Sequence, residues 1–427
     1  MPPDVSSAVE AAYRSHWGRI VATLIKLVGD FDLAEECTQE AFTSALDHWS
    51  ATGVPDSPSA WLIQTARHKA IDRIRRRERY SEKLQSFVAS GLFRTVEQPD
   101  YNLDDIPDER LRLIFTCCHP ALSLEAQVTL TLHTLCGFEA DEIARGFLVP
   151  PTTMAQRLVR AKRKIRVARI PYIVPDLKDM PARLASVLTV VYLVFNEGYA
   201  ATRGNALLRI DLCAEAIRLA RLIQNLMQPQ PPQEVTGLLA LMLLHDARRD
   251  ARHDAVGDLV LLEAQHRGLW NRIQIDEGLS LVGQAMHGDP GPFALQAAIA
   301  AVHCRAARAE NTDWHEILRL YDILKVVQPS PIVSLNRSVA VAMVEGAAQA
   351  LKVIEPLVAG QDLENFHLLH STRADLLRRI GDLTGAASSY RRALTLVRND
   401  SERRYLERRL GEVQRSVSYE TNLDAVE

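Results

Sequence analysis

The chain has 427 residues, 47% of them hydrophobic, and a formal net charge of −3. This length predicts two to three domains, and the near-balance of charge restricts any nucleic-acid surface to local basic segments. The longest apolar run, residues 187–195, is about half of what spans a bilayer, and the first ten residues lack the blocks of a signal peptide. Six cysteines over this length do not form a disulfide framework. We therefore expect a soluble, cytoplasmic protein that does not enter a membrane.

Cys117, Cys118 and His119 are the ligand types that zinc prefers. Two vicinal cysteines do not readily share one tetrahedral ion, and no second C-x-x-C or H-x-x-x-H pair follows them. We expect no metal site and no cofactor.

Almost every segment predicts a helix, because alanine, leucine, arginine and glutamate dominate and strand-like alternation is scarce. We therefore expect an all-α fold. Residues 9–28 predict an amphipathic helix that ends at the turn Gly29-Asp30, and residues 33–49 predict a second helix whose first half is acidic. A short polar loop is expected over residues 50–59.

The next helix, "AWLIQTARHKAIDRIRRRER", is strongly basic over residues 60–79. Apolar residues recur at spacings of three and four and define one buried face, while arginine and lysine occupy the remaining circumference. Taken alone, such a charge run is more often a solvated helix end that the macrodipole favours. From Tyr80 to about Asp105 the pattern weakens and acidic residues collect, which predicts a flexible linker.

Residues 122–165 contain the sharpest motif, "LSLEAQVTLTLHTLCGFEADEIARGFLVPPTTMAQRLVRAKRKI". Ser123 can cap a helix that stops at Gly137, and a short helix follows over residues 139–145. Pro150 and Pro151 suit the start of the next helix, because proline lacks only an N–H that the first turn leaves unpaired. This pattern predicts a helix-turn-helix, whose second helix would read base edges in the major groove. A helical hairpin with a solvated basic face is the alternative.

The predicted reading helix presents polar side chains on one side and is followed by a strongly basic tail. The tail "RAKRKIRVAR" holds six basic residues and no acidic one, and such residues contact phosphates. The candidate DNA-binding residues are Thr152, Thr153, Gln156, Arg157, Arg160, Lys162 and Lys164.

In this order, the acidic helix "DLAEECTQEAF", the basic helix, a linker and the helix-turn-helix resemble a bacterial sigma-70 family factor. More narrowly, the chain resembles the extracytoplasmic-function group, which keeps only regions 2 and 4. The resemblance covers roughly residues 8–168. It implies region 2 over residues 8–80, the linker over 81–105 and region 4 over 106–169. In the family, region 2 binds the beta-prime clamp of core RNA polymerase and opens the minus-10 promoter element. Region 4 docks on the beta flap and reads the minus-35 element.

Residue by residue, the resemblance assigns the acidic helix to the clamp and the basic helix to promoter DNA. The residues expected to bind core polymerase are Asp32, Glu35, Glu36, Gln39 and Glu40. Those expected at the minus-10 element are Trp61, Arg67, Lys69, Arg73, Arg75 and Arg76, with Trp61 also expected to pack in the region 2 core. In region 4, Thr153, Gln156, Arg157 and Arg160 match minus-35 contact positions. Ala155 replaces a basic residue of many relatives, so the preferred minus-35 sequence does not carry over.

The chain continues for about 255 residues beyond region 4, after a proline-marked boundary over residues 170–181. An all-helical extension is expected over residues 182–330, and tetratricopeptide-like (TPR-like) repeats over 331–415. Residues 336–357 and 373–397 are two copies of the repeat pattern, and the turn glycines Gly346 and Gly381 lie 35 residues apart. Such repeats typically bind a protein or peptide. This tail resembles the fused extension of one sigma group, which is thought to act in place of an anti-sigma factor.

Polar residues also lie beside apolar helix segments of the tail: Asn196, Glu197, His245, Asp246, Arg248 and Arg249. They are most often satisfied partners that hold helices together, and a ligand or docking site is the alternative. No nucleophile, phosphate loop or metal spacing accompanies them, so we do not expect an enzyme. A one-component regulator with a helix-turn-helix and a repeat sensor domain is the second hypothesis. The paired acidic and basic helices argue against it, because such a regulator needs one DNA-binding module.

Overall fold

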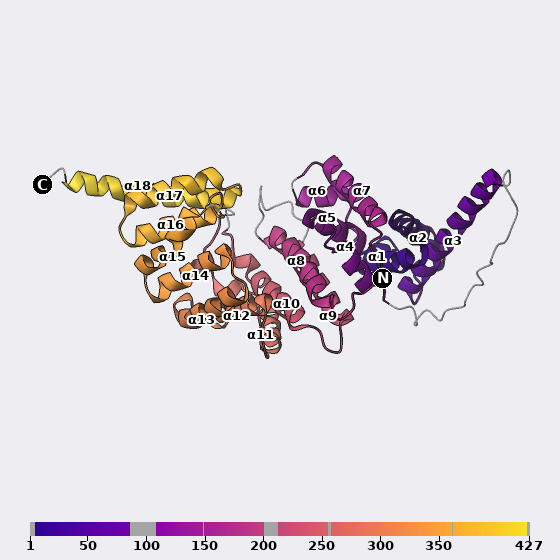
Figure 1. Cartoon of the computed structure of the whole chain (residues 1–427), viewed down its shortest axis with the longest axis horizontal. Coiled ribbons are helices and arrows are strands. Elements are labelled where there is room, and N and C mark those ends of the chain that lie inside the picture. The colour runs from indigo at the N-terminus through magenta and orange to yellow at the C-terminus, as the bar shows by residue number, and fades with distance from the viewer. Residues whose placement is uncertain are drawn as a thin grey trace. The chain divides into compact units, whose positions relative to one another are not determined.

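The computed structural model describes residues 5–85, 108–147, 149–199, 212–254, 258–360 and 362–424. Within these ranges every regular element is a helix (Figure 1). One isolated bridge joins His253 to Leu259. The all-α prediction is confirmed. The chain divides into two compact units, Met1–Val190 and Val191–Glu427. This boundary between compact units lies within helix α8, after Val190, nine residues beyond the proline-marked segment 170–181.

Three helices begin the first unit and pack against one another: α1 (Val5–Val28), α2 (Phe31–Thr52) and α3 (Pro58–Gln85). The Asp30 side chain caps α2 by accepting the N–H of Leu33 at 3.1 Å. Trp49, Ile20 and Leu62 lie fully buried between the helices. Their burial fixes the faces that α2 and α3 expose.

The loop predicted over residues 50–59 is shorter, because α2 continues to Thr52 and α3 begins at Pro58. The hydroxyls of Ser50 and Thr52 donate to the carbonyls of Leu46 and His48, at 2.6 and 2.8 Å, so polar residues here continue the helix. Gly53, with a φ of 84°, ends it. The predicted linker lies largely outside the described residues, and its first five residues continue α3.

The second half of this unit contains the helix-turn-helix. Its elements are α4 (Arg110–Cys117), α5 (Leu124–Leu130), the π-helical turn η2 (Thr131–Leu135), α6 (Ala140–Gly146) and α7 (Pro151–Val167). The predicted signals are present: Ser123 caps α5 at 3.4 Å, Gly137 has a φ of 80°, and α7 begins at Pro151. The helix-turn-helix prediction is confirmed at the level of its helices.

The segment after α7 is fixed to the first unit. The Tyr172 hydroxyl donates to the Ala22 carbonyl at 2.9 Å, and the Arg183 guanidinium donates to the Phe115 carbonyl at 2.6 Å. Arg183 belongs to α8 (Met180–Tyr199), whose first half therefore belongs to the fold of the first unit. These contacts explain why the boundary lies beyond the prolines.

The second unit is a succession of helices in which each contacts the next along the chain from α9 to α18. Their bounds are α9 (Leu212–Leu226), α10 (Gln233–Asp246), α11 (Arg272–Ala285), α12 (Pro292–Arg305), α13 (Trp314–Val327), α14 (Pro331–Val344), α15 (Ala347–Ala359), α16 (His367–Arg379), α17 (Leu383–Leu396) and α18 (Asp400–Asp424). Short 3-10 turns occur at Arg249–Ala251, Leu262–Ala264, Arg267–Leu269 and Ala309–Asn311. Gly346 and Gly381 have positive φ at equivalent turns, between α14 and α15 and between α16 and α17.

Candidate functional site

The acidic residues predicted on α2 divide between two faces. Asp32, Glu36 and Gln39 are exposed and Glu40 is half-buried. Glu35 is only 6% exposed, because it lies four residues after Phe31 and seven before Phe42, on the buried side of the helix. Four of the five side chains are therefore at least partly exposed to solvent, and Glu35 is turned toward other elements of the first unit.

Part of the exposed acidic face pairs with the basic helix α3. The Arg73 guanidinium contacts both Glu36 and Glu40, and the Lys69 ammonium lies 3.7 Å from Glu40. The exposed side-chain fractions of Glu36 and Glu40 are 54% and 40%, so these pairs remain open to solvent. Such pairs contribute little to stability and can exchange partners. The structure thus brings two of the predicted DNA-binding residues against two of the predicted polymerase-binding residues.

The remaining predicted minus-10 residues lie along α3. Trp61 is half-buried, stacks on His48 with ring centroids 5.4 Å apart and meets Trp49 edge-on at 5.6 Å. This agrees with its expected packing role. Arg75 and Arg76 are exposed, and Arg67 is half-buried.

Helix α7 has two distinct faces that match the predicted reading helix. Met154, Leu158, Ala161 and Ile165 are buried and hold the helix on its neighbours α5 and α6. The opposite side exposes four predicted DNA-binding residues at a regular spacing of four: Thr152, Gln156, Arg160 and Lys164. Thr153 is half-buried, and Arg157 pairs with Glu125 at 3.8 Å.

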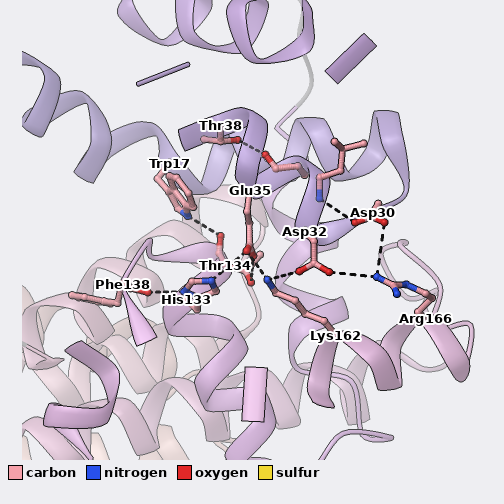
Figure 2. Close-up of polar contacts among 12 residues, drawn as sticks. Trp17, Asp30, Asp32, Glu35, Thr38, His133, Thr134, Phe138, Lys162 and Arg166 are labelled. Atoms are coloured by element: carbon pink, nitrogen blue, oxygen red, sulfur yellow. Dashed lines mark hydrogen bonds and ion pairs between the residues drawn. The ribbon is translucent and has the colours of Figure 1, made fainter. Parts of the chain in front are cut away.

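Lys162, by contrast, points away from this exposed face and toward α2 (Figure 2). Its ammonium lies 2.6 Å from a Glu35 carboxylate oxygen and 3.0 Å from Asp32, and its side chain is 11% exposed. One turn further along α7, Arg166 reaches Asp32 at 3.4 Å and Asp30 at 3.9 Å. The basic tail of the helix-turn-helix and the start of the acidic helix therefore form one ion-pair network.

The remaining hydrogen-bond partners of the Glu35 carboxylate come from the turn η2. The Thr134 hydroxyl donates to Glu35 at 2.9 Å, and His133 Nε2 lies 3.2 Å from the second carboxylate oxygen. His133 Nδ1 lies 2.7 Å from the carbonyl oxygen of Phe138. Since both ring nitrogens face acceptors, a doubly protonated imidazole satisfies both contacts.

The electrostatics of this cluster are mutually reinforcing. Burial alone would raise the pKa of Glu35, but the hydrogen bond from His133 and the charge of Lys162 lower it overall. Burial alone would lower the pKa of His133 and of Lys162, but Glu35 raises both. All three groups therefore favour their charged forms when the cluster is assembled.

Side chains of α1 donate to backbone carbonyls of the same helix-turn-helix segment. The Trp17 indole N–H donates to the Thr134 carbonyl at 3.2 Å, and the Tyr13 hydroxyl donates to the Gly137 carbonyl at 3.0 Å. Gly18 lies so close to η2 that a Cβ at this position would overlap the carbonyl oxygen of Leu135. We call these contacts, together with the Glu35–Lys162 cluster, the α2–α7 seam. The roles of Trp17, His133 and Thr134 were not predicted from the sequence, although His133 and Thr134 lie inside the apolar run "TLTLHTLCGF", where polar residues are a signal for buried polar contacts.

The polar residues of the tail are partners of one another within the second unit. The Arg248 guanidinium donates to His245 Nδ1 at 2.9 Å and to the Tyr199 hydroxyl at 3.2 Å. Asp246 pairs with Arg249 at 2.6 Å and accepts from Gln274 at 2.9 Å. Asn196 hydrogen-bonds to Tyr192, and Glu197 is buried. These contacts favour the structural interpretation of the set.

Cys117 and Cys118 lie buried in the core of the first unit. The Cys118 sulfur contacts the Thr131 hydroxyl at 3.5 Å, and burial raises the pKa of this thiol to about 12. Among the described residues, no three His, Cys, Asp or Glu side chains gather as metal ligands would. None of the helices in the described ranges is both long and apolar enough to span a membrane.

Comparison with known families and proteins agrees with this geometry. The family model for sigma-70 region 2 matches residues 12–80, and that for sigma-70 region 4 matches residues 112–165. A third family, of unknown function (DUF6596), matches residues 183–286. No solved structure gives a significant match.

Among individual proteins, an uncharacterized protein of Rhizobium meliloti is 43% identical over 405 residues, which cover 94% of this chain and 95% of the relative. The probable ECF RNA polymerase sigma factor SigI of Mycobacterium tuberculosis is 29% identical over 167 residues, 38% of this chain and 56% of the relative. The ECF RNA polymerase sigma factor SigL of the same species is 28% identical over 164 residues, 38% of this chain and 89% of the relative.

Proposed function

We propose that this chain, which belongs to the extracytoplasmic-function group of sigma-70 factors and carries a C-terminal extension, binds core RNA polymerase and directs it to promoter DNA. The observation that carries the proposal is the face of α7, where Thr152, Gln156, Arg160 and Lys164 project from a helix whose other side is buried. A glutamine flanked by a threonine and an arginine at helical spacing suits base edges and phosphates in a major groove. Since core polymerase is cytoplasmic, we place the protein there.

In region 2, we assign polymerase binding to the exposed part of α2. Asp32, Glu36, Gln39 and Glu40 form an acidic surface that complements the basic coiled coil of the beta-prime clamp. The neighbouring basic residues of α3 would follow the promoter backbone at the minus-10 element, where they offset the cost of extruding bases. Release of Arg73 from Glu36 and Glu40 when polymerase occupies α2 would free this cation for DNA.

In region 4, we assign base recognition to Gln156 and Thr152, and phosphate contacts to Arg160 and Lys164. Thr153 and Arg157 lie at the border of this face, and Arg157 would exchange Glu125 for a phosphate. Docking of region 4 on the beta flap is part of the same proposal.

For the extension, we propose a TPR-like platform that regulates the sigma domains and binds a protein or peptide. Successive contacts from α12 to α18 and the equivalent turns at Gly346 and Gly381 support it. A cavity of about 260 Å³ is lined by residues of α14, α16, α17 and α18 and of the segment 259–263, with Ser371, Asp375 and Tyr405 among them. Such a hollow is the kind of surface on which helical repeats bind extended segments. We assign no catalytic role to any part of the chain.

Co-elution with purified core polymerase in the absence of DNA tests the proposal. A sigma factor forms this complex, whereas a one-component regulator binds its DNA and leaves core enzyme free. Absence of the complex together with specific binding to the upstream region of its own gene would favour the regulator.

A further inference from the structure

We propose that region 4 and core RNA polymerase compete for the same side of α2, so that the α2–α7 seam is a closed state that must open before polymerase can bind. The inference rests on the proposed function and concerns its regulation. In the closed state, two of the five predicted polymerase-binding residues are already occupied, because Lys162 bridges Glu35 and Asp32 (Figure 2). The seam also withdraws Lys162 from DNA.

Glu35 is buried by groups from the helix-turn-helix half of the first unit. Its side chain is 8% exposed and receives Thr134, His133 and Lys162, all from the helix-turn-helix half of the unit. A polymerase surface can reach this carboxylate only after these groups have withdrawn. The exposed Glu36 and Gln39 on the same helix would then be the initial contact, and Glu35 would be uncovered by opening.

Promoter geometry also requires the seam to open. By their positions, the minus-10 and minus-35 elements lie about 25 base pairs apart, or roughly 85 Å along B-DNA. In the closed state, atoms of α7 contact α2 directly, through Lys162 and Arg166. The helix-turn-helix therefore cannot read the minus-35 element while region 2 occupies the minus-10 element unless the seam has opened.

The chemistry of the seam is suited to reversible opening. Across it, the ion pairs of Lys162 and Arg166 and the hydrogen bonds of Tyr13 and Trp17 are polar contacts that water or another partner can replace. Breaking a buried ion pair is costly when one charge stays buried without a partner. Here the basic clamp can replace Lys162 beside the acids, and DNA phosphates can accept Lys162, so neither charge is left unpaired.

Gly18 offers a way to open the seam without altering any predicted polymerase- or DNA-binding residue. In the variant Gly18→Ala, the added methyl group would overlap the Leu135 carbonyl, while alanine favours the α1 helix itself. Gly283→Ala is the matched control, because Gly283 lies within α11 and a Cβ there meets nothing within 4 Å. Both are made in the full-length chain.

Two quantities are measured for each protein: hydrogen exchange of residues 131–137, and the Kd for core polymerase without DNA. If the closed state dominates, the apparent Kd equals the intrinsic Kd divided by the open fraction. We expect Gly18→Ala to exchange faster at η2 and to bind core about tenfold more tightly, and Gly283→Ala to match the wild type in both. Faster exchange with an unchanged Kd would contradict the proposed competition between region 4 and core polymerase. Unchanged exchange would contradict the closed contact between Gly18 and η2 on which the proposal depends.

If the wild type and both variants all fail to bind core, the proposed function itself is wrong, which is a different outcome. A second variant guards against misfolding of Gly18→Ala. Thr134→Val keeps the volume of the side chain but removes its hydrogen bond to Glu35. We expect it to shift both measurements in the same direction by a smaller factor, and a shift toward weaker core binding in a folded protein would count against the proposal.

Discussion

Lys162 and Glu35, 127 residues apart in the sequence, form an ion pair with a separation of 2.6 Å between nitrogen and oxygen. The first residue belongs to the predicted DNA-binding helix and the second to the predicted polymerase-binding helix. Their contact means that the two surfaces predicted to be functional are not independent in the structure.

Charge reversal on α2 tests the polymerase-binding assignment. We expect Glu36→Lys combined with Glu40→Lys to weaken binding to core polymerase at least tenfold, because two acids facing a basic partner become cations. The fold should persist, since the pairs with Arg73 and Lys69 are solvent-exposed and each contributes less than about 1 kcal/mol. The measurement is a core-binding titration accompanied by circular dichroism.

The matched control for this reversal is Glu355→Lys combined with Glu364→Lys. These two glutamates are similarly exposed and also pair with arginines, but they lie in the second unit. Equal loss of core binding in both double variants would indicate a nonspecific charge effect. It would contradict the assignment of polymerase binding to α2.

The face of α7 is tested by the salt dependence of promoter binding. For the holoenzyme, we expect Arg160→Ala to lower affinity and to reduce the slope of log K against log salt by about one unit, the value for one lost phosphate contact. Arg157→Ala should lower the affinity and the salt slope in the same way if Arg157 exchanges Glu125 for a DNA phosphate. Arg319→Ala, an exposed arginine of α13, is the control. Slopes that match the wild type in both α7 variants would contradict the phosphate role.

Gln156→Ala should have a different effect. Because Gln156 is exposed in the predicted reading position, its loss should relax base preference at one minus-35 position while leaving the salt slope unchanged. Selection of bound sequences from a randomized minus-35 library measures this. An unaltered preference would show that Gln156 does not read a base.

The seam should depend on pH. Glu35 raises the pKa of His133 above its usual 6.5, so the stabilisation from His133 is complete below 6.5 and is lost as pH rises through the raised value. The pKa of Glu35 is lowered below 4.5, so its contribution is present above 4.5 and is lost as pH falls through the lowered value. Lys162, Thr134 and the Phe138 carbonyl, which also face these groups, do not titrate in this range.

We therefore expect protection of η2 from hydrogen exchange, corrected for intrinsic rates, to be greatest between about pH 4.5 and 6.5. His133→Gln should remove the decline on the alkaline side and leave the acidic side in place. Protection that rises steadily from pH 6 to pH 8 in the wild type would contradict the electrostatic description of the seam.

Truncation tests the tail and the boundary at α8. A fragment that ends at Arg169 loses the hydrogen bonds of Tyr172 and Arg183, each contributing about 1 kcal/mol, whereas one that ends at Val190 keeps them. We expect the shorter fragment to unfold at lower urea concentration. Both fragments should differ severalfold from the full chain in transcription if the tail regulates activity, and equal transcription with and without cell extract would leave the tail as a recruitment platform for another partner.

Local chemistry accounts for what could be predicted from the sequence. The cap at Ser123, the stop at Gly137 and the start at Pro151 each depend on a few neighbouring residues, so the helix-turn-helix was predictable almost to the residue. The loop at residues 50–59 was predicted too long, because the hydroxyls of Ser50 and Thr52 bond within the helix rather than ending it.

Contacts between distant segments could not be predicted in this way. Lys162 and Asp32 are charged residues on amphipathic helices, and nothing in their spacing says that one would cover the other. Glu35 is a partial exception, since its place between Phe31 and Thr38 on the buried stripe indicates a polar group directed inward. The identity of its partners still required the structure.

Run-off transcription with purified core polymerase, the full-length chain and the upstream region of its own gene tests the central claim most directly. We predict a transcript with one defined start that requires the chain and is reduced at least tenfold by the reversal of Glu36 and Glu40. Transcription by core polymerase that is unchanged by the chain, although the chain binds the same DNA, would contradict the assignment as an initiation factor.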